Sequence, residues 1–185
     1  MTYRKLGITI VELLTVIGVV LILAAIFAPV MIRAKEASKE TQSKLQLKQL
    51  ALSLNLYREQ QSIANSQGDS FEMGLPPAPQ NDHLTLLNTL QPPNNSHPDV
   101  KILGKSYKCN FGDPGTAMGG FWKQLSRAEG EGSVVFIDPY FNPTDVSLIS
   151  GDRYIRKLIA VRLDTAIVVK HKAGDWTIPT WWITK

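Results

Sequence analysis

The sequence predicts an α+β protein in which one long N-terminal helix precedes a small antiparallel β-sheet. Three features predict this order: an apolar block over residues 8–32, a helical pattern that continues to residue 61, and alternating strands near the C-terminus. The chain has 185 residues. About 150 of them remain outside the block, enough for one small globular domain. A single-domain cytosolic enzyme is therefore not expected.

The apolar block is long enough to cross a membrane. Ile8–Ile32 contain one charged residue, Glu12, and no Asn, Gln, Lys or Arg. As a helix they would span about 37 Å, more than the ~30 Å of a hydrocarbon layer. A secretory signal peptide has a shorter apolar region before a small-residue cleavage site, and the candidate site near Ala28 is followed directly by Pro29. We expect a membrane helix that stays on the protein; an exported soluble protein cleaved near Ala28 is the alternative.

The residues around Glu12 follow a known pattern, KLGITIVELL over Lys5–Leu14. This run resembles the N-terminal processing signal of type IV pilins and type II secretion pseudopilins, in which a short basic leader ending in Gly precedes a long apolar helix. The resemblance implies cleavage after Gly7 by a prepilin peptidase, N-methylation of Ile8 and a role for Glu12 in assembly. Most members have Phe or Met at the position of Ile8, and many have a helix-bending proline at the position of Pro29.

The same resemblance implies the organisation of the chain and its partners. It divides the sequence into a leader (1–7), a transmembrane or filament-core helix (8–32), an amphipathic continuation (33–61) and an exported globular α+β domain (62–185). It implies a single-pass protein of the inner membrane with a cytoplasmic leader, which then joins a filament in the periplasm or at the cell surface. The implied partners are the prepilin peptidase, other pilin-like subunits, an inner-membrane assembly platform and membrane lipid.

The position of Glu12 also has a physical interpretation. A carboxylate in a membrane helix is costly unless something neutralises it. Cleavage after Gly7 would free an amine four residues before Glu12, and the amine of a neighbouring subunit can pair with the carboxylate at low dielectric. Such pairing favours a packed array of helices. The alternative is that Glu12 lies at the membrane interface of a helix that is only an anchor.

The basic residues predict the opposite topology. Arg4 and Lys5 precede the apolar block, whereas five basic residues follow it closely: Arg33, Lys35, Lys39, Lys44 and Lys48. Counting positive charges alone places the C-terminal side in the cytoplasm. The pilin resemblance implies an exported C-terminal domain, and we give it precedence.

The helical pattern continues beyond Pro29 to about Gln61. A stripe at spacings of three and four comprises Ala34, Ala37, Thr41, Leu45, Lys48, Leu52 and Leu56, and a second set adds Leu47, Leu50, Ala51, Leu54 and Tyr57. We expect this half of the helix to pack on the globular domain. Pro29 should bend the helix, because proline lacks a backbone donor and crowds the preceding turn.

The remaining elements are short. Residues 62–82 are rich in Gly and Pro and predict a loop, and Asp82 can cap a short helix over 83–91. Another short helix is predicted over 121–128, and extended segments over 107–111 and 133–137. Apolar residues alternate over 158–163 and 166–170 around an Asp164-Thr165 turn, which predicts an antiparallel hairpin. Trp176–Ile183 predicts an edge strand, where Pro179 is tolerated.

No catalytic or cofactor-binding set emerges, so no enzyme activity and no cofactor are expected. The histidines His83, His97 and His171 are scattered, and Cys109 is the only cysteine. We expect that thiol to be a small buried side chain without reactivity. Without Arg4 and Lys5 the chain has 18 basic and 16 acidic side chains. This balance does not indicate a nucleic-acid partner.

A possible metal site follows the strand over 133–137. Asp138-Pro-Tyr-Phe-Asn-Pro143 resembles the Asp-Pro-Trp-Gly-Asn-Pro run of major pseudopilins, some of which bind calcium in a following loop. Asp138, Asp145 and Asp152 would supply the oxygen ligands that calcium prefers. The sequence has no dense acidic loop, so a plain turn is the favoured interpretation. Farther along, Trp176, Trp181 and Trp182 are expected in the core, with a contact surface as the alternative.

The functional hypothesis is a pilin-like structural subunit, a pseudopilin or minor pilin, of a type IV pilus or type II secretion-type filament. The alternative is a membrane-tethered envelope domain with binding or enzymatic activity. Many adhesive major pilins have a C-terminal disulfide, which this chain cannot form. The sequence leaves open a secretion pseudopilus, a type IV pilus or a DNA-uptake filament, and a major or a minor subunit.

Overall fold

The computed structural model describes residues 9–62, 65–77, 90–94, 99, 106–142, 148 and 154–183. The chain divides into two compact units, Met1–Lys39 and Glu40–Lys185. Helix α1 (Ile10–Gln60) begins in the first unit and ends in the second. A small four-stranded antiparallel sheet follows it in the sequence. The predicted α+β layout, with a long N-terminal helix before the sheet, is confirmed.

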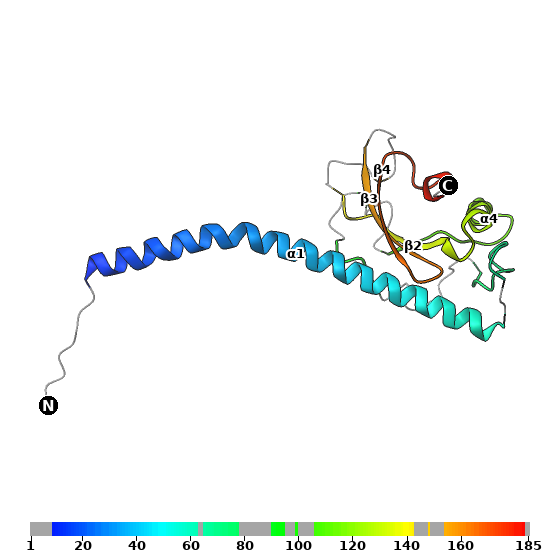
Figure 1. Cartoon of the computed structure of the whole chain (residues 1–185), viewed down its shortest axis with the longest axis horizontal. Helices are drawn as coiled ribbons and strands as arrows, with labels where there is room; N and C mark the ends of the chain where they lie inside the picture. Colours follow the sequence, from blue (N-terminus) through cyan, green and yellow to red (C-terminus); the bar gives the residue numbers. More distant parts are fainter. Residues whose placement is uncertain are drawn as a thin grey trace, which may run out of the picture. The chain divides into compact units, whose positions relative to one another are not determined.

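In the first unit the described residues are helical from Ile10 onward. The predicted start at Ile8 lies outside the described residues. Pro29 lies inside the helix, and Figure 1 shows the α1 ribbon continuing through this region without a break. The apolar sequence of this part therefore forms one continuous helix despite the proline.

Within the described residues, the second unit contains the sheet and, besides the end of α1, three short helical segments (Figure 1). The strands are β1 (Lys108–Cys109), β2 (Val134–Asp138), β3 (Arg156–Arg162) and β4 (Ile167–Lys172), in the spatial order β1-β2-β3-β4. The helical segments are α4 (Ala117–Glu129), the 3₁₀ turn η1 (Gly130–Gly132) and α5 (Pro179–Trp182). The predicted hairpin, the strand at 133–137 and the helix at 121–128 are confirmed. Helix α4 starts earlier than predicted, because the Thr116 hydroxyl caps it by accepting a hydrogen bond from the Gly119 amide.

The central strands of the sheet, β2 and β3, are largely buried on both faces, whereas the residues of β4 are partly buried or exposed. On β3, Ile159 and Val161 belong to a core that contains the buried apolar residues of α1, whereas Leu158 and Ala160 belong to a second core with α4 and α5. Side chains alternate between the two faces of a strand, so this one strand contributes to both cores. The C-terminal part of α1 thus packs on one face of the sheet, as predicted.

The buried face of α1 is narrower than the sequence predicts. The buried residues are Ser43, Leu47, Leu50, Ala51, Leu54 and Arg58. The first predicted stripe is wrong as a core face, because Leu45, Leu52 and Leu56 are each about half exposed or more. Residues two positions apart on a helix point about 200° apart, so burying Leu47 and Leu50 turns Leu45 and Leu52 to solvent.

The predicted edge strand over Trp176–Ile183 is also wrong. Pro179 begins the short helix α5, where its fixed φ suits the first helical position. The ammonium of Lys170 donates to the carbonyl oxygen of Trp182 at 2.7 Å, which satisfies the C-terminal end of this helix. The helix predicted over 83–91 lies outside the described residues except for Leu90 and Gln91, which are not helical.

Candidate functional site

The described chain begins with a reciprocal cap at the start of α1. The backbone N–H and the hydroxyl of Thr9 both donate to Oε2 of Glu12, at 2.9 and 3.0 Å. In return, the N–H of Glu12 donates to the Thr9 hydroxyl at 3.2 Å. This is the capping-box arrangement, which stabilises a helix start by satisfying backbone donors that have no partner within the helix. The carboxylate that the sequence singles out is therefore held by its own chain.

Thr9 is the residue that sequence reasoning missed. The signal was present as Thr9-x-x-Glu12 directly before an apolar run, the spacing that a capping box requires. A negative side chain in the first turn is also stabilised by the helix dipole. The proposed processing positions Gly7 and Ile8 lie outside the described residues.

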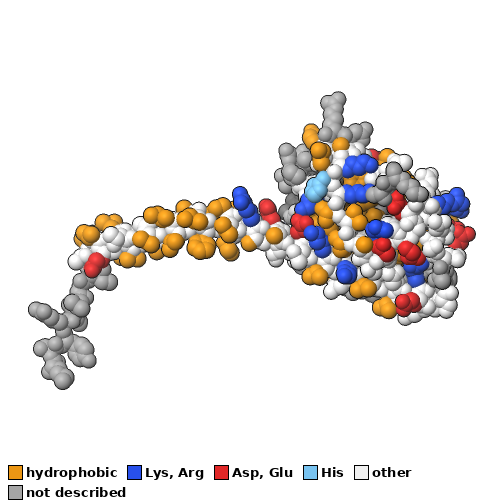
Figure 2. All heavy atoms as spheres, in the orientation of Figure 1, with side chains coloured by type: hydrophobic (Ala, Val, Ile, Leu, Met, Phe, Trp, Pro, Cys, Tyr) orange, Lys and Arg blue, Asp and Glu red, His pale blue; other side chains and the backbone are white. Residues whose placement is uncertain are grey.

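The surface that follows Glu12 is apolar on all sides. The large apolar side chains from Ile10 to Ile32 are 46–78% exposed, and Figure 2 shows orange side chains along this part of the helix with white between them. Among the described residues, α1 is the one helix long and apolar enough to cross a membrane. By length and composition this segment is suited to be a membrane anchor or a signal sequence.

Asp138 lies at the end of β2 and is fully buried. Its carboxylate accepts a hydrogen bond from the Ser43 hydroxyl of α1 at 2.6 Å and another from the N–H of Tyr140 at 3.0 Å. Burial raises the pKa of this carboxyl to about 6, although the two hydrogen bonds lower it in part. Because Ser43 donates to one carboxylate oxygen and Tyr140 to the other, both oxygens of Asp138 have a donor within the protein.

The residues after Asp138 form a hydrogen-bonded turn. The Asn142 amide donates to the carbonyl oxygens of Pro139 and Lys157 at 2.7 and 2.9 Å, and it accepts from the N–H of Lys157 at 2.7 Å. These contacts connect the turn to β3. The other calcium candidates, Asp145 and Asp152, lie outside the described residues. Within the described residues, no group of three or more His, Cys, Asp and Glu side chains is placed to hold a metal ion.

The three C-terminal tryptophans belong to the core, as the sequence analysis favours. Trp176, Trp181 and Trp182 are buried together with residues of α4 and β3. Each indole N–H donates to a backbone carbonyl oxygen, at 2.8, 3.1 and 2.8 Å respectively. Because their polar atoms have partners and their rings are buried, they do not form a free contact surface.

Of the remaining sequence candidates, Cys109 and His171 are described, and His83 and His97 are not. Cys109 is partly buried on β1, and burial raises the pKa of its thiol to about 12. The thiol is therefore protonated near neutral pH. The sequence predicts a buried side chain, whereas Cys109 is only partly buried. His171 lies exposed on β4.

Comparison with known proteins gives no assignment. No family model matches the chain, and no curated protein and no solved structure matches it.

Proposed function

We propose that this chain is a pilin-like structural subunit, a pseudopilin or minor pilin, of a type IV pilus or type II secretion-type filament. It is cleaved after Gly7 by a prepilin peptidase, methylated at Ile8 and assembled through its N-terminal helix. The observation that supports this most is the start of α1, where a single carboxylate precedes an apolar helical surface exposed on every side. Its role is structural, and no catalytic step is assigned to it.

The assembly mechanism follows from the charge of Glu12. In the isolated chain, Thr9 compensates the carboxylate through two hydrogen bonds. In a packed array, the amine that cleavage frees at Ile8 of a neighbouring subunit would be a stronger partner, because opposite charges attract strongly where water is excluded. The apolar side chains from Ile10 to Ile32 would then be covered by membrane lipid before assembly and by other subunits afterwards.

This function places the protein in the inner membrane with its leader in the cytoplasm. The second unit is exported, and the assembled filament extends into the periplasm or to the cell surface. The partners are the prepilin peptidase, other pilin-like subunits, the inner-membrane assembly platform and membrane lipid.

The test is the mass and N-terminal sequence of the chain purified from membranes of cells that carry its own prepilin peptidase. We expect a mature chain that begins at methylated Ile8, and a Gly7→Val variant that keeps its leader. Gly18→Val is the matched control, because a Cβ at Gly18 meets nothing within 4 Å; this variant should be cleaved normally.

Two results would contradict the proposal. A wild-type chain that keeps Met1–Gly7 and stays monomeric would indicate the alternative, a membrane-tethered envelope domain with binding or enzymatic activity. A chain cleaved near Ala28 would indicate an exported soluble protein.

A further inference from the structure

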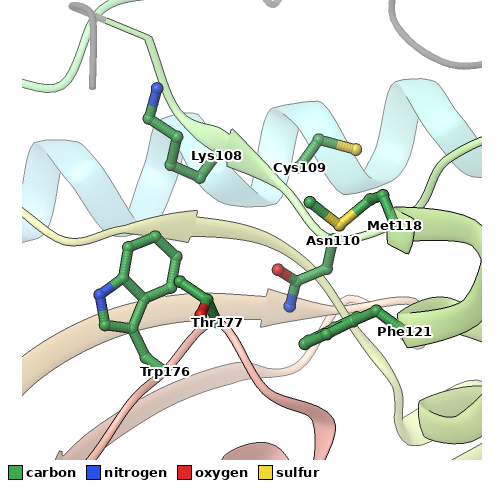
Figure 3. Close-up of a pocket in the computed structure, with 7 residues that line it drawn as sticks. All are labelled: Lys108, Cys109, Asn110, Met118, Phe121, Trp176 and Thr177. Atoms are coloured by element: carbon green, nitrogen blue, oxygen red, sulfur yellow. The ribbon is translucent and has the colours of Figure 1, made fainter. Parts of the chain in front are cut away.

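The second unit contains a small cavity between β1, α4 and the segment before α5, with a volume of about 110 Å³. Figure 3 shows that Asn110, Phe121 and Trp176 reach it from three separate parts of the chain. The amide nitrogen Nδ2 of Asn110 is enclosed by the protein and makes no hydrogen bond in the described part of the chain. A ligand in the cavity cannot reach that donor, so the cavity is a gap in the packing of three segments.

The basic residues that follow the apolar part of α1 are a different feature, which the assembly through Glu12 does not use. Arg33, Lys35 and Lys39 lie in the first unit, within about two helical turns of Ile32. Arg33 and Lys35 are exposed and Lys39 is partly exposed, and Figure 2 shows blue side chains directly beyond the orange part of the helix. These three residues, called the basic segment below, contribute to the positive-charge count that opposes the proposed topology.

The protein itself neutralises little of the charge of the basic segment. Within the described residues, none of its three cations forms an ion pair. Glu36 is the one acidic residue between Arg33 and Lys39 in the sequence. The next acidic residue, Glu40, is already paired with the ammonium groups of Lys44 and Lys157, at 2.8 and 2.6 Å. The basic segment therefore keeps a net positive charge that a partner can compensate.

A membrane crossed by α1 would bring the basic segment to the depth of the phospholipid headgroups. Glu12 and Arg33 are the charged residues that bound the apolar part of the helix, and about 30 Å of helix axis separates them. A hydrocarbon layer has the same thickness, and the headgroups occupy roughly the next 5–8 Å on each side. Residues 33–39 rise over about 10 Å and so cover the headgroup layer.

We propose that the basic segment binds the headgroups of anionic phospholipids through ion pairs between its three cations and the lipid phosphates. Anionic lipids attract basic residues that lie next to a membrane helix, and guanidinium and ammonium groups both bind phosphate. A zwitterionic headgroup carries its own ammonium, which competes for the phosphate. The inference needs α1 to span a membrane, a property that the filament subunit and the tethered domain share, and it does not depend on the filament role.

The test measures which lipid surrounds the helix. The full chain is reconstituted at low ionic strength in phosphatidylcholine vesicles that contain a trace of spin-labelled phosphatidylglycerol or spin-labelled phosphatidylcholine. The motionally restricted fraction of each label in the EPR spectrum gives its relative association constant. We expect phosphatidylglycerol to associate about two- to fivefold more strongly, the effect of one exposed ion pair. This preference should disappear in about 1 M NaCl, where the Debye length is about 3 Å.

The triple variant Arg33→Gln/Lys35→Gln/Lys39→Gln assigns the preference to the basic segment. Glutamine is a good helix former, and none of the three side chains is buried, so α1 should form as in the wild type. We expect the preference for phosphatidylglycerol to fall by about twofold or more. Arg4 and Lys5 precede the apolar part of the chain and are unchanged in the variant, so the difference from the wild type measures the basic segment alone.

The matched control is Lys48→Gln/Lys123→Gln/Arg127→Gln, which removes the same charge from the second unit and should keep the preference. The proposal is overturned if both lipids associate equally with the wild type, if the triple variant of the basic segment keeps the preference, or if the control loses it as well. A triple variant that keeps the preference but fails to assemble would assign these cations to acidic side chains of a second copy instead. N-terminal processing tests the filament role separately, so either idea can fail without the other.

Discussion

Ser43 of α1 donates a 2.6 Å hydrogen bond to Asp138 of β2, although neither side chain reaches solvent. One turn earlier on the helix, Glu40 accepts a 2.6 Å hydrogen bond from the ammonium of Lys157 on β3. Glu40 and Ser43 are three residues apart and therefore share a helix face. Two polar contacts and the leucine core thus hold this part of α1 on the sheet.

The first prediction concerns the pH dependence that Asp138 confers. Its folded pKa of about 6 lies above the 3.8 of an unperturbed aspartate, so the folded state binds the proton more tightly. The stability that this group contributes is full below about pH 4 and is lost as the pH rises through 6. For this group alone we expect a loss of about 3 kcal/mol. Urea unfolding of the full chain in detergent, followed by tryptophan fluorescence, should show this slope in the wild type and a flatter profile for Asp138→Asn. Identical profiles would contradict the assignment.

Ser43→Ala should destabilise the second unit by about 1–3 kcal/mol, because a buried carboxylate loses a donor. It should also raise the pKa of Asp138 further, since the hydrogen bond from Ser43 lowers that pKa. The matched control is Ser53→Ala on the same helix, where the hydroxyl donates only to the nearby carbonyl oxygen of Leu50. Equal losses of unfolding free energy for the two variants would mean that the hydrogen bond between α1 and β2 stabilises the protein no more than one within the helix.

Replacing each of two adjacent glycines of α4 by alanine should change the stability of the protein in opposite directions. A Cβ at Gly119 would lie 2.1 Å from the carbonyl oxygen of Asp113, a backbone atom that cannot simply rotate away. Gly119→Ala should therefore cost more than about 2 kcal/mol. A Cβ at Gly120 meets nothing within 4 Å, so Gly120→Ala should stabilise the helix by about 0.5–1 kcal/mol. Thermal unfolding of both variants checks this, and a shift of the same sign would contradict the packing at α4.

Arg58 anchors the C-terminal end of α1. Its guanidinium donates to both carboxylate oxygens of Glu131 at 3.1 and 3.0 Å, and to the carbonyl oxygens of Met73 and Asn65 at 2.8 and 3.2 Å. Arg58→Met should cost about 2 kcal/mol or more, because it removes donors from partly buried carbonyls. Glu131→Gln should cost less, because this side chain is 41% exposed. Equal losses in urea unfolding would show that the carbonyl contacts add no stability beyond the ion pair.

Glu12→Val tests the assembly mechanism. The variant should be cleaved and inserted like the wild type, but its subunits should not form filaments, because the neighbour's amine lacks a carboxylate. Glu36→Val, an exposed position on the same helix, is the control and should assemble. The measurement is the amount of subunit recovered in sheared filaments relative to membranes. Equal recovery from both variants would refute a role for Glu12 in assembly.

Elements with local signals could be predicted from the sequence. The hairpin combines alternating apolar residues with a two-residue turn signal, and Val161 indeed pairs with Ile167 across that turn. The length of α1 could likewise be predicted, from the helical spacing of its apolar residues. These signals need no information about distant parts of the chain.

The incorrect predictions depend on long-range contacts. Two apolar stripes on α1 compete for the core, and the contact of Ser43 with Asp138 accompanies burial of the second stripe. The aromatic segment after Trp176 has strand-forming residues, but strand propensity depends strongly on context. The cavity at Asn110 could not be predicted, because three segments far apart in the sequence form it.

The protonated thiol of Cys109 has a practical consequence. Maleimides and spin labels react with thiolates, so at neutral pH they should modify this partly buried side chain slowly. The native cysteine would then add little background signal in site-directed labelling. A single cysteine placed at exposed Leu52 would react first, and distances between labelled subunits would become measurable without removing the native residue.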